Sequence, residues 1–116
     1  MHPHHQKKIE DLTKSAKIFV FMKGEKQQPM CGFSASVVEM LNELEAEYET
    51  FDVLQDQEIR QAIKEYTAWP TIPQIFIDSK FIGGADILQE LYESGELQKM
   101  IGEKKTSSTK NSRKKK

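Results

Sequence analysis

The sequence predicts one α/β domain, with a four-stranded mixed sheet and helices on both of its faces. Three observations support this class. Residues 18–22 are all apolar, which is typical of a strand covered on both faces. Helical spacing follows this strand and again follows the next strand, so the order predicts a βαβ unit with parallel strands. A length of 116 residues, with 37% apolar and 30% charged residues, suits a single soluble domain.

The first half of the chain contains the βαβ unit. Its two helices are indicated by apolar residues at i, i+3, i+4 and i+7, which share one helix face. These residues are Val37, Met40, Leu41 and Leu44, then Ile59, Ala62, Ile63 and Tyr66. The other elements expected here are a flexible leader over 1–8, a short helix over 9–15, a strand over 17–22, a polar loop over 25–28 and a strand over 48–53.

The second half is expected to add an antiparallel hairpin and two helices. Pro70 and Pro73 interrupt any helix, because proline lacks a backbone donor and restrains the residue before it. A strand over 74–78 follows, and the two-residue turn Ser79-Lys80 pairs it with a strand that starts at Phe81. The remaining elements are a helix from about Asp86 to Gly95, a short helix docked by Leu97, Met100 and Ile101, and a disordered basic tail over 103–116.

Charge and composition narrow the function classes. The tail holds 7 basic and 1 acidic residues, a balance of +6, whereas residues 1–102 hold 10 basic and 17 acidic, a balance of −7. An acidic domain gives no case for a nucleic-acid surface. No apolar run approaches the roughly 18 residues that cross a bilayer. The single cysteine excludes an internal disulfide and a zinc site of several cysteines, and it favours a reducing compartment, either cytoplasmic or the mitochondrial matrix if a transit peptide has been removed.

That single cysteine, Cys31, stands where the first strand leads into the first long helix. The first N–H groups of a helix lack partners, and the aligned peptide dipoles add positive potential there. Both effects stabilise a thiolate, so we expect the pKa of Cys31 to fall below that of an ordinary thiol. The alternative is a buried structural cysteine. The neighbouring Pro29, Gly32 and Ser34 favour an exposed turn instead.

The order of these elements resembles the thioredoxin-like architecture, in which a cysteine at the first helix faces a cis-proline loop. Ile72-Pro73 is the candidate for that cis bond. Four motifs make the resemblance specific to monothiol glutaredoxins of the CGFS type over about residues 9–102. They are Lys23, Cys31-Gly32-Phe33-Ser34, Trp69-Pro70-Thr71-Ile72-Pro73-Gln74 and Gly83-Gly84-Ala85-Asp86-Ile87. The family usually has cysteine where this chain has Ala85, so a second thiol is absent.

The resemblance implies a glutathione site around Cys31, which would be the catalytic thiol and the metal ligand. Its other members would be Lys23 and Arg60 for the glycine carboxylate, the backbone of Ile72 before Pro73 for the cysteinyl residue, and Gly84, Ala85 and Asp86 for the γ-glutamyl end. Each has a plainer alternative. Lys23 and Lys64 could be surface lysines, Arg60 could solvate its helix, and Asp86 could only cap one.

The resemblance also implies a cluster carrier. A [2Fe-2S] cluster takes four thiolates, and one chain with one cysteine supplies a single one. Two protomers and two glutathione molecules complete the set, or a BolA-type partner replaces one protomer. Recipient proteins would then accept the cluster. There are two alternatives: a glutathione-dependent oxidoreductase that acts on mixed disulfides, and a redox-inactive interaction module. Ser34 in place of a second cysteine rules out an internal disulfide but not exchange of mixed disulfides through Cys31 alone.

Overall fold

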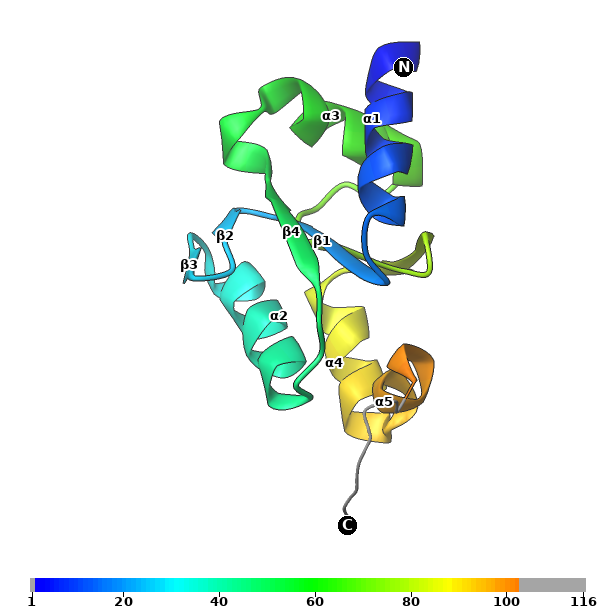
Figure 1. Cartoon of the computed structure of the whole chain (residues 1–116). Coiled ribbons are helices and arrows are strands. Elements are labelled where there is room, and N and C mark those ends of the chain that lie inside the picture. The colour runs from blue at the N-terminus through cyan, green and yellow to red at the C-terminus, as the bar shows by residue number, and fades with distance from the viewer. Residues whose placement is uncertain (1, 103–116) are drawn as a thin grey trace.

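A mixed four-stranded sheet forms the centre of the computed structural model, which describes residues 2–102 (Figure 1). Its strands, in spatial order, are β4 (Glu49–Asp52), β1 (Ile18–Met22), β5 (Gln74–Ile77) and β6 (Lys80–Gly83). Strand β1 runs parallel to β4 and antiparallel to β5, and β5 pairs with β6 as a hairpin. The predicted βαβ unit and hairpin are therefore confirmed.

Strand β1 is buried along its whole length because helices cover both sheet faces. Phe19 and Phe21 pack on one face against α1 (Pro3–Lys14) and α3 (Gln57–Thr67). Ile18, Val20 and Met22 pack on the other face. The helices there are α2 (Gly32–Glu43), α4 (Ala85–Ser94) and α5 (Glu96–Ile101). Two separate apolar clusters thus hold the central strand, as its unbroken apolar run predicted.

The first helix begins earlier than the sequence prediction. Helix α1 starts at Pro3, so residues 3–8, expected as a flexible leader before a helix over 9–15, are helical. Local chemistry explains the difference: the side chain of His2 caps the helix, and Pro3 has a φ suited to its first turn. Tertiary contacts add to this, because Lys8 pairs with Asp56 at 3.5 Å and lies 5.3 Å from the centre of the Phe51 ring.

Two short features also differ from the prediction. The polar loop expected over 25–28 contains a small antiparallel pair, β2 (Gly24–Glu25) with β3 (Gln28–Pro29). The hairpin turn is Asp78-Ser79 rather than Ser79-Lys80, since Lys80 already pairs with Ile77. Both turn residues have positive φ (53° and 66°), as a type I′ turn requires, although neither is glycine. A short 3-10 helix, η1 (Val53–Gln55), links β4 to α3.

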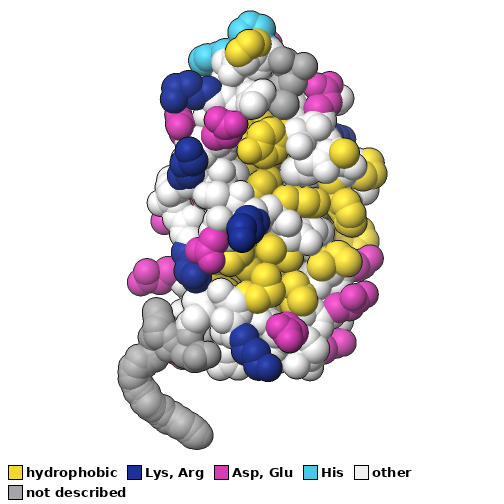
Figure 2. Space-filling view, turned by 90° about the vertical axis from the view of Figure 1, so that its right-hand side faces the viewer, with side chains coloured by type: hydrophobic (Ala, Val, Ile, Leu, Met, Phe, Trp, Pro, Cys, Tyr) yellow, Lys and Arg dark blue, Asp and Glu magenta, His cyan; other side chains and the backbone are white. Residues whose placement is uncertain are grey.

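The edge of the sheet at β6 lies on the side of the molecule seen in Figure 2. Apolar side chains form a band on that face, with charged side chains beside it. Phe81 and Ile82 of β6 are half-buried, and Lys80 at its start is exposed. The basic tail predicted over 103–116 lies outside the described residues. Among those that are described, no helix is long and apolar enough to cross a membrane.

Candidate functional site

Cys31 occupies the N-cap position of α2, directly after the β2–β3 hairpin. Its backbone is extended (φ −154°, ψ 158°), and its sulfur accepts a hydrogen bond from the Ser34 N–H at 3.4 Å. Cys31 as a whole is half-buried. The thiol therefore lies at a strand-to-helix junction, as the sequence predicted, and it is not enclosed in the core.

Ser34 forms a second contact with the same sulfur. Its hydroxyl oxygen lies 3.3 Å from Cys31 Sγ and accepts a hydrogen bond from the Lys23 N–H at 3.2 Å. Because the Lys23 N–H donates to this oxygen, the hydroxyl proton is available for donation to a thiolate. Ser34 is fully buried, so water does not compete for this contact. Ser34 thus links the end of β1 to the reactive sulfur.

These contacts lower the pKa of the Cys31 thiol. Burial is the largest single influence and acts in the opposite direction, since it raises the pKa. Hydrogen bonds from the Ser34 side chain and from the N–H groups of Ser34 and Phe33 lower it, as does the positive charge of Lys23. The lowering influences prevail, so the thiolate is populated at a lower pH than in an unfolded chain.

Replacing Ser34 with alanine is expected to raise the pKa of Cys31, because the hydroxyl donor is lost while burial remains. The rate of alkylation by iodoacetamide, followed against pH, measures this. The midpoint should move to higher pH, and the rates of the two proteins should meet at alkaline pH. Ser36→Ala is the matched control on the same helix. A midpoint that stays in place in Ser34→Ala would show that the hydroxyl does not stabilise the thiolate.

Lys23 and the Ile72-Pro73 pair lie at the same end of the sheet as Cys31. The antiparallel ladder ends with Phe21 opposite Gln74, so Lys23, which follows β1, and Ile72-Pro73, which precede β5, lie at the same end of the sheet. The Lys23 carbonyl accepts the Met30 N–H at 2.8 Å, which draws the segment before Cys31 to the same end. The Ile72-Pro73 bond is cis, as predicted. The structure therefore brings these three predicted positions together.

The glycine pair Gly83-Gly84, at the junction of β6 and α4, lies beside the cis-proline segment. A side chain on Gly84 would begin 3.3 Å from the Pro73 carbonyl oxygen and 3.4 Å from Trp69 Nε1. Gly84 thus touches the cis-proline segment, and its small size permits the approach. Gly84 caps α4, Ala85 is buried as its first residue, and Asp86 is exposed in its first turn.

Arg60 is the predicted site residue that the structure connects least to the others. It lies half-buried on α3, between Ile59 and the exposed Gln61. Within residues 2–102 its guanidinium forms no ion pair. Its place on α3 is compatible with both alternatives that the sequence offered, a contact with glutathione and solvation of its own helix.

Two features near Cys31 were not identified from the sequence. Met30 and Phe33, on either side of Cys31 and Gly32, are 59% and 64% exposed, which is high for large apolar side chains. Gln74 is fully buried at the start of β5, just after Pro73. All three residues lie in or beside the sequence motifs, but residue type alone predicts neither the exposure of Met30 and Phe33 nor the burial of Gln74.

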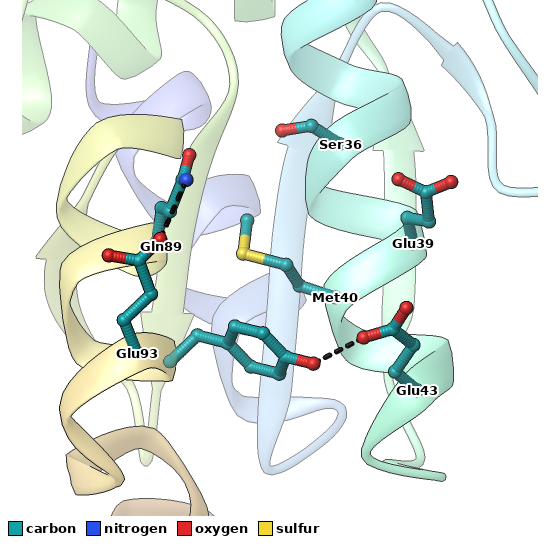
Figure 3. Close-up of a pocket in the computed structure, with 7 residues that line it drawn as sticks. Ser36, Glu39, Met40, Glu43, Gln89 and Glu93 are labelled. Atoms are coloured by element: carbon teal, nitrogen blue, oxygen red, sulfur yellow. Dashed lines mark hydrogen bonds between the residues drawn. The ribbon is translucent and has the colours of Figure 1, made fainter.

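A groove between α2 and α4 has a different character from the Cys31 site (Figure 3). Its volume is about 350 Å³, and its lining residues are Ser36, Glu39, Met40, Glu43, Gln89, Tyr92 and Glu93. The Tyr92 hydroxyl donates to Glu43, and this hydrogen bond to a carboxylate raises the pKa of Tyr92. Three carboxylates and no cation line the groove, so it disfavours an anionic tripeptide. None of the predicted glutathione residues lies in it.

Metal ligands are sparse in one copy of the chain. Within residues 2–102 no group of three or more histidine, cysteine, aspartate or glutamate side chains is arranged to hold a metal ion. Cys31 is the chain's only cysteine.

The sheet order, the cis-proline loop and the helix-capping thiol together define a thioredoxin-like fold with a one-cysteine site. Residues 18–82, more than half of the chain, match the family model described as Glutaredoxin. The chain belongs to the glutaredoxin family. An uncharacterized monothiol glutaredoxin, ycf64-like, of Synechocystis is 54% identical over 101 residues, which are 87% of this chain and 94% of that protein.

Other relatives carry organelle names. A monothiol glutaredoxin-S7, chloroplastic, of Oryza sativa is 47% identical over 80% of this chain and 55% of its own length. A glutaredoxin-related protein 5, mitochondrial, of Danio rerio is 48% identical over 79% of this chain and 60% of its own length.

Solved structures agree with this membership. Reduced poplar apo GrxS14 superposes with a TM-score of 0.74 at 45% identity and covers 83% of this chain and 88% of that chain. A buckwheat glutaredoxin-glutathione complex gives 0.74 at 28% identity and covers 87% and 94%. The thioredoxin-like fold and the monothiol glutaredoxin resemblance that the motifs predicted are thus confirmed.

Proposed function

We propose that this chain binds glutathione beside Cys31 and, as a dimer bridged by two glutathione molecules, carries a [2Fe-2S] cluster to recipient proteins for iron–sulfur biogenesis and iron homeostasis. One observation carries the proposal: the single thiol is half-exposed and has a lowered pKa, and Ser34 stands where a second thiol would be needed. Such a site offers one stable thiolate and no internal disulfide.

The cluster needs four thiolates, and this chain can supply one. Two copies of Cys31 and two glutathione thiols complete the set, and a BolA-type partner in place of the second copy gives the heterodimeric version. The exposed Met30 and Phe33 side chains support a docking surface for another protein around the sulfur. A free thiolate persists best in a reducing compartment, such as the cytoplasm or the mitochondrial matrix.

The backbone of Ile72 supports glutathione binding next to Cys31. Its side chain is buried in the core, which fixes the main chain. Within residues 2–102, neither its N–H nor its C=O forms a hydrogen bond. An unpaired strand-like residue beside a thiol can pair with the cysteinyl residue of a peptide, as an added strand does. The buckwheat relative named as a glutathione complex supports the same ligand.

Charges at the two ends of this segment suit the ends of glutathione. Lys23 lies near enough to Cys31 to lower its pKa, and we assign it, with Arg60, to the glycine carboxylate. The N–H groups of Ala85 and Asp86 open α4 and suit the γ-glutamyl carboxylate, whose ammonium then faces Asp86. Gly84 lets this helix end approach the Pro73 carbonyl.

Anaerobic reconstitution tests the proposal. The purified chain is incubated with iron, sulfide and glutathione, and its visible spectrum and its mass in solution are recorded. We expect a coloured dimer that becomes a colourless monomer when the cluster is lost, and no colour when glutathione is omitted. A colourless protein with rapid turnover of a glutathione mixed disulfide would instead support the oxidoreductase. A protein with neither property would contradict both.

Asp86→Ala is expected to raise the Kd for glutathione by about threefold to tenfold, the range for loss of one partly exposed charged contact. Titration calorimetry with the reduced tripeptide measures this. Glu90→Ala, one turn further along α4, is the matched control and should leave the Kd unchanged. Melting curves should show folded proteins in both cases, because both side chains are exposed. Equal Kd values for the two variants would remove Asp86 from the site.

A further inference from the structure

Gln74 is a buried amide placed directly behind the cis-proline segment. Its side chain is fully buried at the start of β5, although nothing in a strand requires a polar residue there. Its Nε2 donates to the Trp69 carbonyl at 3.0 Å and to the Thr71 carbonyl at 3.2 Å. Its Oε1 accepts from the Thr67 hydroxyl at 2.9 Å. Both amide protons are therefore used on the loop that leads to Ile72.

These contacts fix the amide in one orientation. Both N–H groups face carbonyl oxygens, and the oxygen faces a hydroxyl, so a flipped amide would set its oxygen against the two carbonyls. The hydroxyl of Thr67 also accepts the Trp69 N–H at 3.2 Å and lies 3.0 Å from the Ile63 carbonyl. The amide thus connects the last turn of α3, the loop and β5 in one buried network.

The loop is held at its other side as well. The Trp69 N–H donates to the Lys64 carbonyl at 3.1 Å, and the Trp69 ring packs edge-on against Phe81 at 5.5 Å between centroids. Trp69 Nε1 is buried without a hydrogen-bond partner within residues 2–102. The ring therefore packs the loop but gives it little directional bonding. Gln74 supplies the hydrogen bonds that fix two carbonyls of the loop, those of Trp69 and Thr71 on either side of Pro70.

We propose that Gln74 is a positioning residue for glutathione: its side-chain amide holds the segment 69–71 so that the unpaired backbone of Ile72 faces the ligand beside Cys31. This inference rests on the proposed function, since it assumes that Ile72 pairs with the tripeptide. Gln74 itself does not touch glutathione. It acts through the loop, and a loop free to shift by about 1 Å loses the paired geometry.

Gln74→Met tests this, because methionine keeps the length and apolar stem of the side chain but donates no hydrogen bond. We expect the Kd for reduced glutathione, measured by calorimetry well below the melting temperature, to rise about tenfold or more. The alkylation pH profile of Cys31 should stay unchanged, since its donors are Ser34 and Phe33. Thr67→Val removes only one contact of the amide and should give a smaller rise.

Thr13→Val is the matched control for lost stability. Thr13 is also buried and polar, but its hydroxyl bonds to Glu10 within α1. It should lower the melting temperature and leave the Kd unchanged. The inference would be overturned if Gln74→Met melts cooperatively and its Kd for glutathione lies within twofold of that of the original chain. If Gln74→Met does not fold, an unchanged Kd for Thr67→Val would overturn it instead. If the original chain itself does not bind glutathione, the proposed function fails first and the inference with it.

Discussion

Replacing Cys31 with serine is expected to abolish both cluster binding and the formation of a mixed disulfide with glutathione. Each depends on the one thiol of the chain, and serine offers neither a soft ligand for iron nor a redox-active atom. The visible absorption of the reconstituted protein should fall to the level of protein without iron. Mass spectrometry after treatment with oxidised glutathione should show no adduct.

The same substitution should leave the fold intact, which makes the chemical loss interpretable. Cys31 caps α2 by accepting the Ser34 N–H, and serine is among the best residues at an N-cap. We therefore expect a melting temperature equal to that of the original chain or slightly higher. A Cys31→Ser protein that retains its cluster would refute the assignment of Cys31 as ligand, and one that melts early would show that the sulfur has a structural role.

The features that sequence reasoning predicted best are those set by local pattern. The unbroken apolar run of β1 implied two covered faces, and the structure has an apolar cluster on each. The position of Cys31 between this strand and a helical pattern implied a helix-capping thiol. Both conclusions follow from burial and periodicity, which a strand or helix carries in its own residues.

The features that it did not predict depend on partners distant in the chain. Helix α1 starts at Pro3 partly because Lys8 meets Asp56 and Phe51, which belong to later elements. The turn at Asp78-Ser79 is set by the pairing of Lys80 with Ile77, and Lys17 adds an ion pair with Asp78 at 3.1 Å. Such contacts have no signature in a single stretch of sequence.

In the site, too, the residues of the motifs were predicted, whereas the contacts that hold them in place were not. The motifs identified Lys23, Cys31, Pro73 and Gly84, and the structure brings these four to one end of the sheet. The hydroxyl of Ser34 was understood from the sequence only as a missing thiol. The hydroxyl contacts both the sulfur of Cys31 and the N–H of Lys23, which follows β1. Only the tertiary structure brings these two groups together, so the sequence could not predict the contact.

Gly24→Ala is expected to destabilise the domain by about 2–6 kcal/mol, because two effects add. Gly24 has a φ of 90°, which strains any residue with a side chain by about 1–3 kcal/mol. A methyl group there would also lie 2.6 Å from the Gln28 carbonyl oxygen and 2.7 Å from the Met30 nitrogen. These are backbone atoms of the short hairpin and cannot rotate away, so overpacking adds about 1–3 kcal/mol.

Gly95→Ala separates the two effects. Gly95 has a similar φ of 85°, but a methyl group there would meet no atom within 4 Å, so only the backbone strain applies. Urea unfolding of both variants should show a loss of about 1–3 kcal/mol for Gly95→Ala and a larger loss for Gly24→Ala. Equal losses would mean that the hairpin yields and that the steric contact has no effect on stability.

Gly24→Ala should also change the reactivity of Cys31, because Gly24 lies next to Lys23 and Met30, whose backbone hydrogen bond holds the segment before Cys31. Its N–H donates to Asp52 at 2.9 Å, while the Lys23 carbonyl next to it holds the Met30 N–H. A displaced Met30 moves Cys31 away from Ser34, so we expect slower alkylation at neutral pH in folded Gly24→Ala but not in Gly95→Ala. Unchanged alkylation in a destabilised Gly24→Ala would show that α2, rather than the hairpin, determines where the sulfur lies.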